Sequence, residues 1–158
     1  MTNLKTILIT GSNRGIGLEL VKESLTKNFS VIGTFRNKEN SQELFQLSSN
    51  NINLFEMDVV DEKSVLDVSK NIHNPIDYLI CNAGINNGYG SIFDQDHTHE
   101  KMLEVLNVNV IGSILTVKHF SKILNKDAKI ILISSIMGVQ NHSAVSYTHL
   151  RAHETLEN

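Results

Sequence analysis

The sequence has little cysteine or proline, no excess of positive charge and no long hydrophobic run. Its single cysteine, Cys81, excludes an internal disulfide and fits a reducing cytoplasm. The net charge of -3 argues against a nucleic-acid-binding surface. No apolar stretch approaches the roughly 18 residues that cross a bilayer, and residues 7–10 are too short for a signal peptide. We therefore expect a soluble cytoplasmic protein that binds neither nucleic acid nor a membrane.

What the sequence does contain is a regular alternation of two patterns within 158 residues, enough for one globular domain. Apolar runs typical of strands occupy residues 7–10, 30–35, 52–57, 76–81 and 129–134. Helical periodicity begins near residue 15 and recurs at 61–72, with Asp61 as the N-cap, and at about 100–124. This order predicts an α/β fold with a doubly wound parallel sheet, which binds ligands at the carboxyl ends of its strands.

The first strand leads into a glycine-rich loop that opens a helix. The loop reads Gly11, Ser12, Asn13, Arg14, Gly15, Ile16, Gly17, and the expected apolar face of the helix is Ile16, Leu20, Val21 and Leu25. A helix N-terminus presents unpaired N–H groups and a positive dipole end, so it attracts phosphate, and glycines allow a close approach. Glycines also serve ordinary turns and helix C-caps. The position between a strand and an amphipathic helix favours phosphate binding.

With Thr10 before it, this loop resembles the Thr-Gly-x-x-x-Gly-x-Gly motif of the classical short-chain dehydrogenases/reductases, a family of Rossmann-fold NAD(P) enzymes. Two later segments follow in the family's order. Asp58-Val59 is similar to the pair that meets the adenine ring, and Asn82-Ala83-Gly84 to a segment beside the cofactor. The alternatives are that Asp58 caps a helix and that Asn-Ala-Gly only ends a strand.

Arginine follows the second strand, at Arg36, where an NAD-preferring enzyme usually has an acidic residue for the ribose 2′-OH. A guanidinium there favours a 2′-phosphate, and Arg14 in the glycine loop supplies a second positive group. The alternative is that both arginines are solvated surface residues. We therefore expect NADP(H) to be preferred over NAD(H).

Two polar residues resemble the family's catalytic positions. Asn109, in an Asn-x-x-Gly segment that ends at Gly112, takes the role of the residue that bends a helix and positions a water in the proton relay. Ser135, after the fifth strand, takes the role of a hydrogen-bond partner for the substrate oxygen. The alternatives are a core amide satisfied by backbone groups, and a serine that only opens a loop.

The end of the chain departs from the family. Tyr147 and Arg151 approximate the expected Tyr-x-x-x-Lys, but arginine does not replace that lysine well. From Val145 the run resembles the translation of a transposon adapter used in DNA sequencing. We expect an incomplete Rossmann domain in residues 1–144, truncated after about five strands, and an artefactual tail in residues 145–158. His149 and His153 lack a third ligand, so we expect no metal site.

The resemblance implies an oxidoreductase that transfers hydride between a nicotinamide cofactor and a small carbonyl or alcohol. The middle region is closest to carbonyl-reductase-like and C-factor-like members of the family. Full-length members are usually homo-oligomers, whereas oligomerisation of this chain is doubtful, and we expect weak cofactor binding and no turnover from it. The alternative is a non-catalytic NAD(P)-binding sensor, which needs the glycine loop and Arg36 but neither Asn109 nor Ser135.

Overall fold

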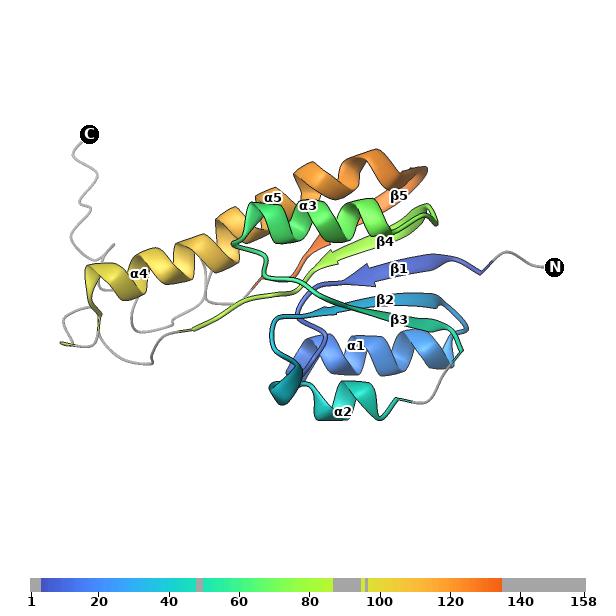
Figure 1. Cartoon of the computed structure of the whole chain (residues 1–158), viewed down its shortest axis with the longest axis horizontal. Coiled ribbons are helices and arrows are strands. Elements are labelled where there is room, and N and C mark those ends of the chain that lie inside the picture. The colour runs from blue at the N-terminus through green and yellow to red at the C-terminus, as the bar shows by residue number, and fades with distance from the viewer. Residues whose placement is uncertain (1–3, 48–49, 87–94, 96, 135–158) are drawn as a thin grey trace, which may run out of the picture.

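The computed structural model describes residues 4–47, 50–86, 95 and 97–134 and shows one parallel sheet between two layers of helices (Figure 1). The five strands are β1 (Thr6–Ile9), β2 (Ser30–Phe35), β3 (Ile52–Glu56), β4 (Ile76–Cys81) and β5 (Leu124–Leu132). Their order across the sheet is β3-β2-β1-β4-β5, and every neighbouring pair is parallel. The order reverses at β1, so the carboxyl ends of β1 and β4 form the ligand-binding edge. The expected α/β fold is confirmed.

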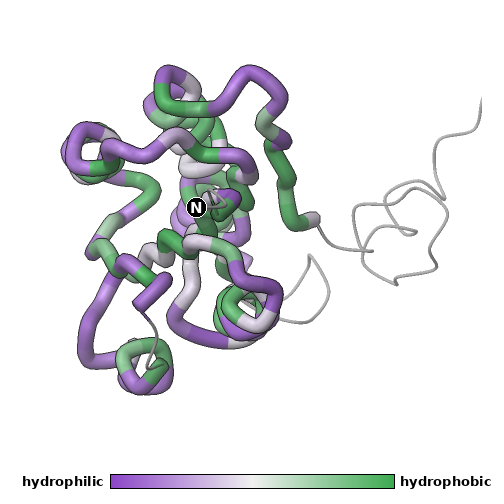
Figure 2. The backbone as a smooth tube through the Cα atoms, turned by 90° about the vertical axis from the view of Figure 1, so that its right-hand side faces the viewer, coloured by the Kyte–Doolittle hydropathy of each residue, from purple (hydrophilic) through white to green (hydrophobic). Residues whose placement is uncertain are grey.

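The helices cover the two faces of this sheet. They are α1 (Gly15–Thr26), α2 (Gln42–Phe45), α3 (Glu62–Asn71), α4 (His99–Leu106) and α5 (Gly112–Phe120). Figure 1 shows α1 and α2 on one face and α3 and α5 on the other. Figure 2 shows helices nearly end-on, carrying both hydrophilic and hydrophobic residues, as amphipathic covers of a sheet must. Within the described residues, no helix is long and apolar enough to cross a membrane.

The core divides into two layers because successive strand residues point to opposite faces. Leu8 of β1 packs in the layer beneath α3 and α5, with Val65 and Phe120. Ile7 and Ile9 belong to the other layer, beneath α1 and α2. All of these side chains except Ile7 are fully buried.

The strand boundaries at 30–35 and 76–81 are confirmed, and β3 ends at Glu56, one residue early. β5 differs more, since it begins at Leu124 rather than at residue 129. Leu124 pairs with Ile76 and Lys129 pairs with Tyr78, and the mostly polar residues between them form a bulge, where Asn125 Nδ2 donates to Asp77 Oδ1 at 2.7 Å. Backbone pairing, which an apolar pattern does not report, extends this strand.

The expected apolar face of α1 is corrected at its first turn. Ile16 is 62% exposed, whereas Leu18 and Val21 are buried. The helix starts at Gly15, beyond the carboxyl end of β1, so its first turn has no sheet beneath it. Ile16 instead lines the cavity described below.

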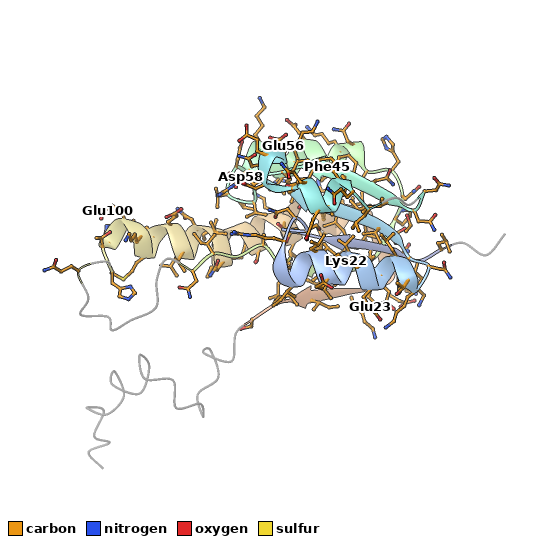
Figure 3. The ribbon with its side chains drawn as sticks, turned by 90° about the horizontal axis from the view of Figure 1, so that it is seen from below. Lys22, Glu23, Phe45, Glu56, Asp58 and Glu100 are labelled. Carbon is orange, nitrogen blue, oxygen red and sulfur yellow. The ribbon has the colours of Figure 1, made fainter. Side chains whose placement is uncertain are left out.

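The helical stretch near 100–124 is one continuous rod with an irregular centre. A π-helical turn, Asn107–Ile111, separates α4 from α5, and a 3-10 turn, Ser121–Ile123, precedes β5. Figure 3 shows α4 projecting from the body of the sheet, with Glu100 near its far end. Asp61 caps α3 as expected, because its carboxylate accepts from the Lys63 N–H at 3.0 Å.

Candidate dinucleotide-binding site

A cavity of about 530 Å³ lies at the carboxyl ends of the strands. Its walls come from the glycine loop, the turns after β2, β3 and β4, and the π-helical turn. The lining residues are Gly11, Asn13, Arg14, Gly15, Ile16, Gly17, Arg36, Asn37, Asn40, Met57, Asp58, Val59, Asn82, Ala83, Gly84, Ile85 and Val108. Five segments far apart in the sequence therefore meet at one site.

The glycine loop takes a shape that only glycine adopts easily. Gly11 and Gly15 have φ angles of +66° and +54°. A Cβ on Gly17 would collide with the Gly11 carbonyl and lie 2.5 Å from Asn82 Nδ2. The cradle therefore tolerates no side chain at residue 17.

The N-terminus of α1 opens into this cavity. Among the described residues, no side chain caps the helix, and its first turn contains no acidic residue. The N–H groups of a first helical turn lack intrahelical partners and carry the positive end of the dipole. This end of α1 suits a pyrophosphate.

Thr10 and Asn82 join the glycine loop to the turn after β4. The backbone N–H groups of Asn82 and Ala83 both donate to Thr10 Oγ1 at 3.0 Å. Asn82 Nδ2 donates to the carbonyls of Thr10, at 2.9 Å, and Gly11, at 3.1 Å. These bonds fix the two segments against each other, and Asn82 does more than end a strand.

Ser12 and Asn13 shape the loop in different ways. The hydroxyl of the fully buried Ser12 donates to the Ile9 carbonyl at 2.7 Å, and Ser12 does not line the cavity. Asn13 Nδ2 donates to the Asn40 carbonyl at 3.1 Å, so it links the loop to the turn after β2. Ser12 therefore stabilises the loop from its buried side, away from the cavity.

Two positively charged residues line the cavity, one in the glycine loop and one in the turn after β2. Arg14 and Arg36 both line it and are exposed, and neither forms an ion pair with another described residue. Asn37 and Asn40 also line the cavity, and the sequence did not predict them as site residues. The position of Asn37, directly after Arg36 at a strand end, was the available signal.

Asp58 and Val59 line the wall that β3 provides. Asp58 Oδ1 accepts from the Val60 N–H at 3.1 Å in a local turn, so the helix cap is Asp61 alone. Met57, directly before them, also lines this wall, and Asp58 is the charged residue among these three. The sequence did not predict Met57 as a site residue, because its side chain has no polar group that indicates cofactor binding.

Asn109 lies in the π-helical turn and holds the segment after β4. Its Oδ1 accepts from the Ile85 N–H at 2.8 Å, and its Nδ2 donates to the Ile85 carbonyl at 3.0 Å. Both groups of the amide are therefore satisfied by backbone, as in the alternative interpretation, but the residue is exposed and is not among those that line the cavity. Ile85 and Val108, which line the cavity, carried no motif in the sequence.

Cys81 contributes no reactive thiol. It is buried at the end of β4, and desolvation raises the pKa of its thiol to about 11, so it stays protonated near neutral pH. No group of three or more His, Cys, Asp or Glu residues suited to a metal occurs within the described part of the chain. Ser135, Tyr147, Arg151, His149, His153 and the tail from Val145 lie outside the described residues.

Known proteins resemble this chain in sequence and in structure. The model of the short chain dehydrogenase family matches residues 5–148. An uncharacterized oxidoreductase of Bacillus subtilis (strain 168), YusZ, is 35% identical over 153 residues, covering 91% of this chain and 53% of its own length. The chain thus spans about half the length of the curated relatives it matches.

Solved structures share this fold as well. ElxO with NADP bound is 29% identical, with a TM-score of 0.78 over 89% of this chain and 59% of its own. Carbonyl reductase Sniffer of D. melanogaster is 28% identical, with a TM-score of 0.78 over 89% of this chain and 66% of its own. The family match covers most of the sequence and includes every segment that lines the cavity. The chain belongs to the short-chain dehydrogenase family.

Proposed function

We propose that this chain forms the dinucleotide site of an oxidoreductase that transfers hydride between NADP(H) and a small carbonyl or alcohol. The observation that carries the proposal is the convergence on one cavity of the α1 N-terminus, the Thr10–Asn82 bonds and two arginines that form no ion pair with another described residue. Solved relatives include ElxO with NADP bound. The relatives' descriptions as oxidoreductases favour an enzyme over a non-catalytic sensor.

The described residues suit the parts of NADP(H) in a definite order. The glycine loop and the first turn of α1 would hold the pyrophosphate, because free N–H groups at a helix N-terminus attract an anion. Arg14 and Arg36 would hold the 2′-phosphate through charge-assisted hydrogen bonds. Asp58 and Val59 would contact the adenine, and the segment from Asn82 would lie beside the nicotinamide ribose. When bound, the nicotinamide supplies or accepts the hydride.

Two residues carry the proposed chemistry. Asn109 orients the segment around Ile85 through both of its amide groups and would position a water in the proton relay. Ser135, whose role rests on its place after β5 in the sequence, would donate a hydrogen bond to the substrate oxygen. We also propose a cytoplasmic location, because the free thiol of Cys81 suits a reducing compartment.

A titration of the chain with NADPH and with NADH tests the cofactor part of the proposal. We expect weak binding, with NADPH bound more tightly than NADH, in a fluorescence or calorimetric titration. Equal dissociation constants would overturn the NADP(H) preference. Binding of neither dinucleotide would overturn the site itself.

We propose further that residues 1–144 are the authentic domain and that the tail from Val145 is not native. Sequencing the same gene from independent genomic DNA tests this, and we expect a Tyr-x-x-x-Lys motif downstream of Ser135. The protein so encoded should oxidise NADPH in the presence of aldehydes or ketones, whereas the 158-residue chain should show no turnover. Recovery of the run from Val145 in frame would refute the tail proposal.

A further inference from the structure

Gly112 begins α5 and lies directly against Val59, in the turn after β3. A Cβ built on Gly112 would lie 2.7 Å from Val59 Cγ2 and 3.0 Å from Val59 Cβ, closer than real side chains approach. Val59 cannot easily yield, because it is a stiff β-branched residue buried in the core layer beneath α5. The helix would have to move instead.

The two neighbours of Gly112 both belong to the dinucleotide site. Val59 lines the cavity, and Asn109, one helical turn before Gly112, holds Ile85 by two hydrogen bonds. Glycine is among the least favourable residues inside a helix, so its presence at the start of α5 needs a reason outside the helix. Close contact with Val59 supplies that reason.

The rest of α5 is fixed independently of this contact. Lys118 Nζ and His119 Nε2 lie 2.7 and 2.9 Å from Glu62 Oε1 of α3, and Phe120 is fully buried. A displacement forced at Gly112 would therefore be taken up mainly on its N-terminal side, which is the π-helical turn with Asn109. That side has the fewest buried residues of the rod.

We infer that Gly112 is a positioning residue of the site: by lacking a Cβ, it lets the helix rest on Val59 and so places the Asn109 amide on the backbone of Ile85. The consequence for Asn109 and Ile85 follows from the described contacts alone. The consequence for cofactor binding rests on the proposed function.

Hydrogen exchange of the unliganded full chain tests the inference at Ile85. In Gly112→Ala, we expect the Ile85 amide to exchange about tenfold faster, as for the loss of one hydrogen bond. The Leu79 amide, in the fully buried centre of β4, should not change, which separates a local displacement from global unfolding. Ile114→Ala is the matched control, since it alters helix propensity on the exposed side of the same helix. Unchanged Ile85 exchange in Gly112→Ala would overturn the inference.

A second substitution at Val59 tests the cause. Val59→Ala removes the atom that would lie 2.7 Å from the new Cβ. If the two substitutions acted independently, their effects on Ile85 exchange would multiply. We expect the double variant to exchange at Ile85 about threefold or more slowly than that product. If Gly112→Ala alone fails to fold, recovery of folding in the double variant supports the inference, and no recovery overturns it. NADPH affinity should fall in Gly112→Ala together with the Ile85 protection, and it is compared only between the wild-type chain, Gly112→Ala and Ile114→Ala, because Val59 itself lines the cavity. If the wild-type chain binds no NADPH, the proposed function fails while the exchange result still decides the role of Gly112.

Discussion

Thr10 shows how much of the site depends on one hydroxyl group. Its Oγ1 accepts hydrogen bonds from two consecutive N–H groups, those of Asn82 and Ala83, and the residue is 1% exposed. A buried N–H group without a partner costs more than an average hydrogen bond contributes. The contact between the glycine loop and the turn after β4 therefore depends on Thr10.

We expect Thr10→Val to lower the free energy of unfolding by about 2 kcal/mol or more, because it strands two donors while keeping the side-chain volume. Urea unfolding measures the loss. Thr26→Val is the control, since the exposed Thr26 hydroxyl, at the end of α1, donates to the Glu23 carbonyl and accepts no hydrogen bond from another described residue. Equal stability of the two variants would contradict the role given to Thr10.

Arg36 is expected to decide which dinucleotide binds. Arg36→Ala should weaken NADPH binding about tenfold to a hundredfold, the equivalent of one charge-assisted bond, and leave NADH binding nearly unchanged. Parallel titrations with both dinucleotides measure this. Lys38→Ala removes an equal charge two residues away, on a side chain that lies over Phe45 and does not line the cavity. A similar loss of NADPH affinity in both variants would show only general charge attraction.

At the scale of elements, the start of α3 depends on its cap. Asp61 accepts from the Lys63 N–H, and the helix begins one residue later, beside the turn that carries Asp58 and Val59. Asp61→Ala should cost about 1 kcal/mol of stability, and Asp61→Asn should cost much less because asparagine caps equally well. Chemical denaturation of the two variants compares them, and equal losses would point to charge rather than to capping.

The ion pairs between α3 and α5 predict a dependence on pH. The Lys118 ammonium, followed by His119, lowers the pKa of the Glu62 carboxyl below its ordinary value of 4.5. A carboxyl whose pKa is lower in the folded state stabilises that state above its unfolded pKa, and the contribution disappears as the pH falls through the folded pKa. The contribution is therefore present at neutral pH and lost in acid.

Thermal unfolding of Glu62→Gln beside the wild-type chain tests this dependence. The difference in melting temperature should be largest near neutral pH and should shrink in acid, below the ordinary pKa of the carboxyl. Because the pair is exposed, we expect only a small difference. A difference that grows in acid would contradict the assignment.

At the scale of the molecule, the sheet in the described residues ends in β3 on one side and in β5 on the other. β5 is the last strand in the described order, and its apolar residues Ile130 and Leu132 are exposed, Leu132 to 61%. An uncovered apolar edge strand is a template for association with other chains. The stability of this chain in solution therefore depends on how that edge is covered.

We expect Leu132→Lys to raise the concentration at which the chain stays monomeric, because a lysine on an edge strand opposes strand pairing. Light scattering measures the change. Gln46→Lys adds the same charge on an exposed residue at the end of α2 and should have a smaller effect. Equal effects of the two would show that net charge, and not the edge, governs association.

The sequence by itself determined the α/β fold, the strands at 30–35 and 76–81 and the segments that line the cavity, because strand periodicity, glycine spacing and residues after strand ends are local features. It did not place Ile16 outside the core or extend β5 back to Leu124, and it did not give Ser12 a supporting position. The exposure of Ile16, the length of β5 and the position of Ser12 depend on neighbours in the folded chain that are distant in the sequence. Only the tertiary structure put Asn109 on Ile85 and Gly112 on Val59, because these contacts join residues 24 and 53 positions apart, which no local pattern encodes.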